Sequence, residues 1–189
     1  MLITSSRLDL VPLTLDFMRA SLAHDTDTCS WILGATVPPE WPEPDYRYVL
    51  DLRIGQLEAD PSLLPWLMRA MVDRETRAMV GDIGFHTAPA PEYLQPYSPE
   101  AVEFGFGVFP EYRRKGYARE AAKAMMHWAT DNHGVTEFIM TIRPDNVASQ
   151  ALAAQLGFVK IASHIDEIDG EEDILELRLN SIRDELSGG

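Results

Sequence analysis

The segment from Val102 to His133 constrains the fold most, because it predicts a strand, a basic turn and a long helix in direct succession. Residues 102–108 alternate between apolar side chains on one face and Glu103 with two glycines on the other, which is typical of a strand with one buried face. Pro110 ends this strand, and apolar residues at helical spacing then predict a helix over about 118–133. The segment therefore indicates a sheet with a helix packed against it.

The rest of the chain predicts more helices and several hairpin strands. The predicted elements are a strand at 7–11, a helix capped by Thr14, a helix at 45–58, a hairpin of 66–72 and 78–85, a strand at 137–142, a helix from Asn146 to Gly157, and a hairpin of 158–165 and 174–179 across Asp169-Gly170. In the second helix, Tyr48, Val49, Leu52 and Ile54 are spaced for one buried face. Together these elements predict a mixed α/β fold.

The charge balance excludes two classes of partner. The chain carries 16 Lys plus Arg against 30 Asp plus Glu, a formal net charge of −14. Proteins that coat nucleic acid or an anionic membrane need the opposite surplus, so we expect neither partner.

Other composition features predict a single cytoplasmic domain over residues 1–189. No apolar run approaches the ~20 residues that span a bilayer, and the start lacks the features of a signal peptide. The single Cys29 excludes an internal disulfide and a multi-cysteine zinc cage. His24, His127, His133 and His164 show no metal-ligand spacing, so we expect no metal.

The turn between the strand and the long helix is a candidate anion site. It contains Arg113, Arg114, Lys115 and Gly116, and the next residues open the helix. The first amides of a helix lack internal partners and carry the positive end of its dipole, so they can hold a phosphate. A solvated basic turn is the simpler alternative, but the order of strand, glycine and helix favours the anion site.

Two other phosphate-binding motifs are excluded. Gly105-Phe-Gly107 resembles the start of a dinucleotide fingerprint, but Pro110 stands where the third glycine is needed. The G-x-x-x-x-G-K-[ST] motif of P-loop nucleotidases does not occur.

Four stretches, in order, resemble the motifs of the GNAT N-acetyltransferases. Arg113-Arg-Lys-Gly116-Tyr-Ala118 is similar to the [RQ]-x-x-G-x-[GA] acetyl-CoA motif, and residues 103–108 resemble the E-I-G-Y-x-V strand before it. Residues 146–158 resemble the N-x-x-S-x-x-L-x-x-x-L-G-F helix after it. Residues 4–13 are similar to the T-x-R-L-x-L-R-P-L start of the branch that contains the ribosomal-protein N-terminal acetyltransferases.

This resemblance implies a GNAT fold, with a mostly antiparallel twisted sheet that splays into a V between its fourth and fifth strands and binds acetyl-CoA there. It also implies the cofactor-binding residues. The pantetheine would pair with the strand edge at Phe106 and Val108, Asn146 would hydrogen-bond the cofactor, and the pyrophosphate would lie on the backbone of Arg113, Arg114, Lys115, Gly116, Tyr117 and Ala118. Asn146 is also a good helix N-cap, and the two roles are compatible.

Acetyl transfer to an amine needs groups that accept and donate protons. Many relatives use a tyrosine on the helix after the asparagine as the acid, but the corresponding residue here is Ala153. Ser149, one turn earlier, is the candidate acid by resemblance to the ribosomal-protein branch, and a plain helix residue is the alternative. Glu103 is the candidate base, acting through a water, and His86 is a second candidate because imidazole side chains are common proton acceptors.

The acceptor is expected to be a primary amine, either a protein N-terminus or a small molecule. Aromatic and acidic residues near the two proline-rich stretches, 37–44 and 88–99, would suit a cationic amine. These aromatics are Trp31, Trp41, Tyr46, Tyr93 and Tyr97, and covering apolar surface is their simpler role.

Three functions stay open at this point. The first is an N-acetyltransferase that works by direct attack in a ternary complex. The second is a non-catalytic acyl-CoA binding module, which the loss of the tyrosine at Ala153 keeps in view, and the third is a transferase of a longer acyl group. Exposed strand edges are compatible with a homodimer.

Overall fold

The computed structural model describes residues 1–44, 46–166 and 170–179. These residues form two compact units, one of 1–84 with 106–121 and the other of 85–105 with the described residues from 122 onward. Asp45 and Asp169, which the sequence places in a helix and a turn, lie outside the described residues.

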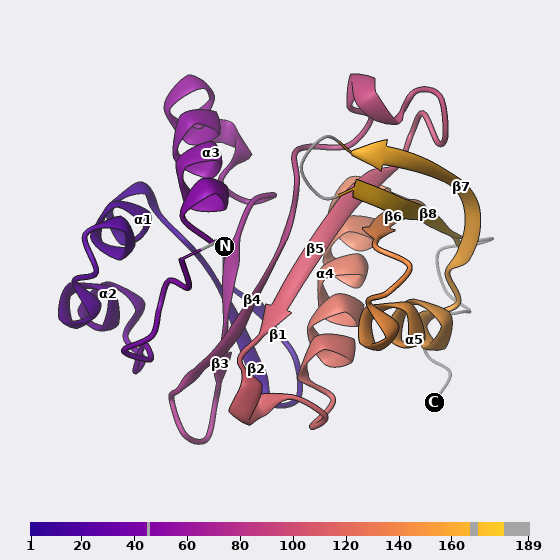
Figure 1. Cartoon of the computed structure of the whole chain (residues 1–189). Helices are drawn as coiled ribbons and strands as arrows, with labels where there is room; N and C mark the ends of the chain where they lie inside the picture. The colour runs from indigo at the N-terminus through magenta and orange to yellow at the C-terminus, as the bar shows by residue number, and fades with distance from the viewer. Residues whose placement is uncertain (45, 167–169, 180–189) are drawn as a thin grey trace. The chain divides into compact units, whose positions relative to one another are not determined.

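Helices and strands follow one another along the chain in the order shown in Figure 1. The strands are β1 Ile3–Thr4, β2 Leu8–Pro12, β3 Arg69–Asp73, β4 Met79–Phe85, β5 Val102–Val108, β6 Glu137–Ile142, β7 Val159–Asp166 and β8 Gly170–Arg178. The helices are α1 Leu15–Leu22, α2 Thr26–Leu33, α3 Tyr46–Ala59, α4 Tyr117–His133 and α5 Val147–Leu156, with short 3₁₀ turns at Pro61–Leu63, Glu92–Leu94 and Pro110–Tyr112. The chain passes between the units inside β5 and α4, and at the last residue of β4.

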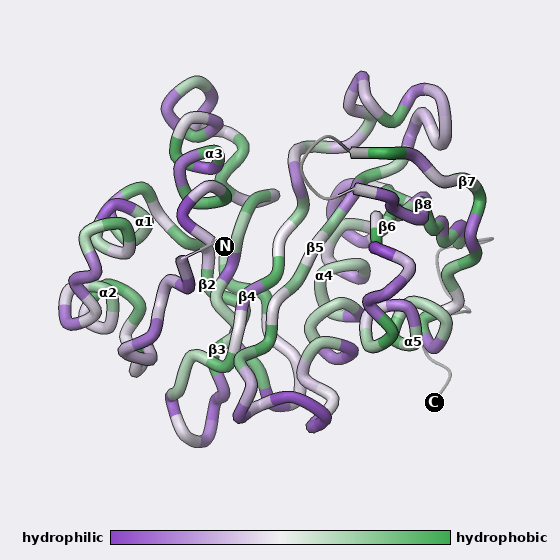
Figure 2. The backbone as a smooth tube through the Cα atoms, viewed as in Figure 1, coloured by the Kyte–Doolittle hydropathy of each residue, from purple (hydrophilic) through white to green (hydrophobic). Residues whose placement is uncertain are grey.

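The first unit is an antiparallel sheet in the order β1-β2-β3-β4. The second half of β5 continues this order, because a Cβ built on Gly81 of β4 would lie 2.1 Å from the carbonyl oxygen of Gly107. Hydrophilic residues fill the connection between β3 and β4, while the strands carry mostly hydrophobic ones (Figure 2).

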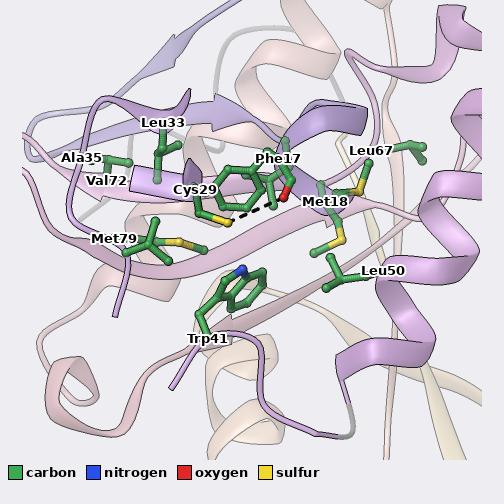
Figure 3. Packing of buried hydrophobic residues seen from close by; sticks show 14 of the residues in the cluster. Phe17, Met18, Cys29, Leu33, Ala35, Trp41, Leu50, Leu67, Val72 and Met79 are labelled. Carbon is green, nitrogen blue, oxygen red and sulfur yellow. Dashed lines mark hydrogen bonds between the residues drawn. The ribbon is translucent and has the colours of Figure 1, made fainter. Parts of the chain in front are cut away.

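Side chains from α1, α2 and α3 form one hydrophobic core with β3 and β4. Phe17 and Cys29 point into it from the first two helices, and Met79 points into it from β4 (Figure 3). The indole of Trp41 lies in the same core and donates a hydrogen bond to Ser21 Oγ at 2.8 Å. Burying this set of apolar side chains holds the three helices against the sheet.

The second unit contains the start of β5, which pairs with β6 in parallel. β8 lies between β6 and β7 and is antiparallel to both. Phe104 packs edge-on against Phe85 and Phe158, and Phe85 stacks on Trp128 of α4, so aromatic rings join the strands to the helix.

The predicted fold class is confirmed: the fold is mixed α/β, with β5 and β6 paired in parallel and the pairings β1–β2, β2–β3, β3–β4, β6–β8 and β7–β8 antiparallel. Thr14 caps α1, and the predicted strands 102–108 and 137–142 have the observed bounds. The predicted helix at 146–157 is also confirmed, since Asn146 caps α5 and Gly157 ends it at φ 91°. One domain over 1–189 stays a prediction.

Two predictions about the helices of the first unit were wrong or incomplete. Tyr48 and Leu52 of α3 are exposed, and the buried positions are Leu50, Arg53 and Leu57. Val49 and Ile54 pack against the core as predicted, so the predicted face was partly right and did not include Arg53. The sequence analysis also missed α2, an eight-residue helix whose polar first turn is capped by Asp25.

Replacing Gly81 with Ala is expected to lower the free energy of unfolding by about 1–3 kcal/mol or more, because the new methyl group would meet backbone atoms of β5. Gly55→Ala in α3 is the matched control. A Cβ there meets nothing within 4 Å, so this substitution should stabilise the helix by about 0.5–1 kcal/mol. Urea unfolding measures both, and equal midpoints for the two variants would contradict the close β4–β5 approach.

Candidate functional site

The loop before α4 has the backbone geometry of an anion site. Arg114 and Gly116 adopt left-handed conformations, at φ 61° and φ 81°. No amide of residues 114–119 donates a hydrogen bond to another described residue, and the first bond of the helix runs from Glu120 N to Gly116 O. Successive unpaired amides in such a loop form a concave anion-binding nest at the positive end of the helix dipole.

The side chains of this loop are exposed and basic. Arg113, Arg114 and Lys115 all face solvent, and the stretch is strongly hydrophilic in Figure 2. Arg113 Nε donates to the carbonyl oxygen of Val108 at 2.9 Å, which ties the loop to the end of β5. The predicted loop residues therefore lie together and can offer both amides and positive charge to a phosphate.

Glu120, in the first turn of α4, fixes the loop to the N-terminal segment. Its Oε1 accepts hydrogen bonds from Ser5 Oγ and Arg7 N at 2.7 Å and from Ser6 Oγ at 2.9 Å, and its Oε2 accepts one from Arg7 Nε at 2.7 Å. Burial raises the pKa of this carboxyl group, but the hydrogen bonds from Ser5 and Arg7 outweigh it and hold the pKa below its ordinary value. Glu120 is therefore a charged anchor.

Arg7 connects Glu120 to the loop itself, because it donates hydrogen bonds to both. Its Nη1 donates to the carbonyl oxygen of Lys115 at 3.1 Å, and its guanidinium lies 4.7 Å from the ring centre of Tyr117. The Tyr117 hydroxyl in turn donates to Asp73 Oδ2 at 2.8 Å, which raises the pKa of the phenol. The sequence analysis missed Arg7, although the residue stands in the quoted opening motif.

The predicted strand-edge residues lie in the same unit as the loop. Phe106 and Val108 are half-buried at the end of β5, and Gly107 stands between them. The next residue, Phe109, donates its amide to the carbonyl oxygen of Val80 at 3.1 Å. The hydrogen bonds of Arg113 and Phe109 thus fix the loop and the end of β5 to each other and to β4. A cofactor long enough to contact both segments needs them to be fixed in this way.

Asn146 and Ser149 lie in the second unit, at the start of α5. The Asn146 side chain accepts a hydrogen bond from Ser149 N at 3.2 Å, so its N-cap role is confirmed. The Ser149 side chain is half-buried, and Ala153, where relatives carry the tyrosine, is fully buried. The roles of Asn146 toward the cofactor and of Ser149 as an acid stay predictions.

Glu103 and His86, predicted as alternative bases, are hydrogen-bonded to each other in the second unit. His86 Nδ1 lies 3.3 Å from Glu103 Oε2, and the Thr141 hydroxyl donates to Glu103 Oε1. Burial raises the pKa of Glu103, but hydrogen bonds from His86 and Thr141 outweigh it and hold the pKa below its ordinary value. A charged Glu103 therefore orients the imidazole, in the way a carboxylate orients a catalytic histidine.

A buried carboxylate in the first unit was missed. Asp82 stands in the middle of β4 with 4% of its surface exposed, and the Tyr46 hydroxyl of α3 donates to its Oδ2. Burial raises the pKa of Asp82 to about 7, against the hydrogen bond from Tyr46, which lowers it. A lone acidic residue within the otherwise apolar run Met79–Phe85 was the available signal.

The candidate acceptor aromatics divide into exposed and buried residues. Trp31 and Tyr93 are exposed, at 83% and 49%. Trp41 belongs to the core of the first unit, and Tyr97 packs on a smaller cluster in the second. The prediction that Trp41 contributes to the acceptor surface was therefore wrong, because its indole is buried against α1.

The described residues hold no group of His, Cys, Asp and Glu that could bind a metal ion. Nor does any described helix have the length and apolar character needed to span a membrane.

The comparisons with known proteins agree with the fold. The family model described as "Acetyltransferase (GNAT) domain" matches residues 7–159. The uncharacterized N-acetyltransferase YjdG of Bacillus subtilis is 27% identical over 165 residues, which cover 84% of this chain and 89% of the relative.

Solved structures with the same fold include two that are named for ribosomal proteins. A putative ribosomal-protein-serine acetyltransferase from Vibrio cholerae is 17% identical, with a TM-score of 0.62 and coverage of 95% of this chain and 98% of the other. RimL, a ribosomal L7/L12 alpha-N-protein acetyltransferase solved in complex with coenzyme A, is 15% identical, with a TM-score of 0.63 and coverage of 95% and 99%. At these identities the likeness concerns the fold.

Replacing Arg7 with Ala is expected to raise the dissociation constant of coenzyme A about tenfold, because the loop loses a charged hydrogen bond of about 1.5–3 kcal/mol. Arg19→Ala on α1 is the control, since its exposed ion pair with Glu58 lies outside the loop contacts. Isothermal titration measures both variants, and equal affinities would show that Arg7 does not hold the loop.

Proposed function

Because the chain belongs to the GNAT family of acetyltransferases, we propose that it moves an acetyl group from acetyl-CoA directly to a primary amine. The observation that carries the proposal is the anchored loop before α4, with two left-handed residues and a run of amides that have no described partner. A nest of this kind at a helix N-terminus fits a pyrophosphate.

The loop and the adjoining strand supply the cofactor contacts. The backbone of residues 113–118 binds the pyrophosphate, and the side chains of Arg113, Arg114 and Lys115 add positive charge. The strand edge at Phe106 and Val108 pairs with the pantetheine, and Asn146 donates its side-chain amide to the cofactor while its oxygen caps α5. Bound acetyl-CoA supplies the thioester.

Side chains of the second unit carry the proton transfers. The Glu103–His86 pair accepts a proton from the attacking amine, with Glu103 holding the imidazole in place. Ser149 donates its hydroxyl proton to the leaving thiolate, and a proton from solvent restores the hydroxyl. This role replaces the tyrosine acid, because Ala153 has no hydroxyl group.

The acceptor is an amine that is positively charged before reaction. The chain has a formal net charge of −14, which attracts a cationic acceptor. The basic residues of the loop before α4 bind the cofactor and not the acceptor. A protein N-terminus is one acceptor of this class, supported by the two solved neighbours named for ribosomal proteins.

The binding of acetyl-CoA and the release of coenzyme A over a panel of amines test this function. Isothermal titration should show 1:1 binding of acetyl-CoA, and the panel should contain at least one amine that is turned over. Binding without turnover would favour a non-catalytic acyl-CoA module, which the buried Ala153 keeps as the alternative. Tighter binding of propionyl- or succinyl-CoA would indicate a longer acyl group.

Gly116→Glu should abolish binding of acetyl-CoA, because it adds a negative side chain to a left-handed position in the nest. Gly134→Glu is the matched control. It also adds a charge at a left-handed glycine, at the other end of α4, and a Cβ there meets nothing within 4 Å. Retained affinity in the Gly116 variant would overturn the site.

Ser149→Ala should lower kcat by about 10²–10⁴-fold and leave the KM for acetyl-CoA nearly unchanged, since the hydroxyl acts only as the thiolate leaves. Gln155→Ala, an exposed position on the same helix, controls for effects on α5. An unchanged kcat would contradict the role of Ser149 as the acid and leave it only a structural role in α5.

A further inference from the structure

Arg114 holds its backbone in a conformation that arginine rarely adopts. Its φ is 61°, in the left-handed region where a Cβ atom crowds the backbone and where glycine is favoured. Gly116, two residues further along the same loop, has a φ of 81° and carries no side chain. The loop thus has glycine at one left-handed position and arginine at the other, so the side chain of Arg114 costs free energy in the folded chain.

A second arginine with the same strain shows what such a side chain contributes. Arg77, in the turn between β3 and β4, has a φ of 54°. Its Nη1 donates a hydrogen bond to Asp9 Oδ2 and its Nη2 donates one to the carbonyl oxygen of Gly34, both at 2.9 Å. These contacts within the chain account for an arginine at that position, because they offset the backbone strain.

The guanidinium of Arg114 has no such partner among the residues that the structure describes. The other two cations of the loop are engaged. Arg113 Nε donates to the carbonyl oxygen of Val108 at 2.9 Å, and Lys115 Nζ lies 5.2 Å from the ring centre of Tyr112. Arg114 is exposed, so its N–H donors are accessible from solvent.

Backbone strain together with an unused guanidinium indicates a partner outside the chain. Strained residues are concentrated at sites that hold ligands, where the side chain has a function that offsets the strain. A guanidinium presents parallel N–H donors that match two oxygens of a phosphate group. The free side chain of Arg114 therefore favours a phosphate as its ligand.

The pyrophosphate of the cofactor does not require this side chain, because the amides of the same loop are proposed to bind it. Coenzyme A carries one further phosphate, the monoester on the 3′ oxygen of its ribose. A phosphate monoester has a charge of about −1.5 to −2 at pH 7, which a guanidinium can partly neutralise. The third phosphate is thus the part of the cofactor for which the amides of the nest supply no donor.

We infer that Arg114 binds the 3′-phosphate of coenzyme A and makes the protein select coenzyme A over dephospho-coenzyme A, which lacks this phosphate. The inference rests on the proposed function and names a residue that determines the specificity for its acyl donor. The contact is a bidentate, charge-assisted hydrogen bond, and no covalent bond is made or broken.

The affinities of the wild-type protein for coenzyme A and dephospho-coenzyme A test the inference without any turnover. In isothermal titration, coenzyme A should bind at least about tenfold more tightly, since hydrogen bonds between charged groups are lost with the 3′-phosphate. Equal affinities would overturn the inference and leave the proposed function intact. A protein that binds neither compound would contradict the proposed function itself, and the inference with it.

Arg114→Gly removes the side chain and suits the left-handed backbone. It should weaken the binding of coenzyme A about tenfold and leave the affinity for dephospho-coenzyme A within twofold of wild type. Its urea midpoint should rise, because the strain is relieved and no contact within the chain is lost. Equal weakening of both compounds, or a lower midpoint, would overturn the inference.

Arg114→Asn separates the lost charge from the flexibility that glycine adds to the loop. Asparagine tolerates the left-handed region and has no positive charge, so this variant should lose the preference for coenzyme A to the same extent. A preference that Arg114→Asn retains would overturn the inference.

Arg77→Gly is the matched control. It also replaces an exposed arginine at a left-handed position of the first unit, but one whose side chain is bound to Asp9 and Gly34. The ratio of the two affinities should stay within twofold of wild type in this variant. Loss of the preference here would show a general effect of positive charge and would overturn the assignment to Arg114.

Discussion

The carboxylate of Glu120 is the interaction on which the proposed cofactor site depends. It accepts four hydrogen bonds from Ser5, Ser6 and Arg7. Arg7 also donates a hydrogen bond to the carbonyl oxygen of Lys115, which fixes the loop to the same group. A nest of unpaired amides binds an anion well only if its backbone is fixed beforehand, since ordering a flexible loop would cost conformational entropy at each binding event. The N-terminal segment and the first turn of α4, far apart in the sequence, together hold this loop.

Two buried carboxylates show how burial and hydrogen bonding set different roles for similar groups. Glu103 has donors from His86 and Thr141 that outweigh its burial, so it stays charged and suits an orienting role. Asp82 has one donor, Tyr46, and burial dominates, which raises its pKa to about 7. A carboxyl group whose pKa lies near neutral pH can both accept and release a proton at that pH.

The sequence predicted those parts of the fold that depend on local patterns. Strict alternation set the bounds of β5, and the pairing of Asn146 with Gly157 set those of α5, because caps and strand periodicity act within a few residues. The predicted buried face of α3 was partly right, since Val49 and Ile54 pack against the core while Tyr48 and Leu52 are exposed. The burial of Arg53 depends on packing across the unit. The Glu103–His86 and Asp82–Tyr46 contacts join residues 17 and 36 positions apart and follow from strand and helix pairing, so no local pattern reveals them.

The central claim is that the loop before α4 binds the pyrophosphate of the cofactor. The most direct measurement compares the affinities of the wild-type protein for coenzyme A and for pantetheine, which lacks the pyrophosphate and the 3′-phosphoadenosine. Coenzyme A should bind 1:1, and removal of the pyrophosphate should weaken binding by at least about 100-fold, the loss of roughly two charge-assisted hydrogen bonds. Equal affinity for the two compounds would contradict the assignment of the loop.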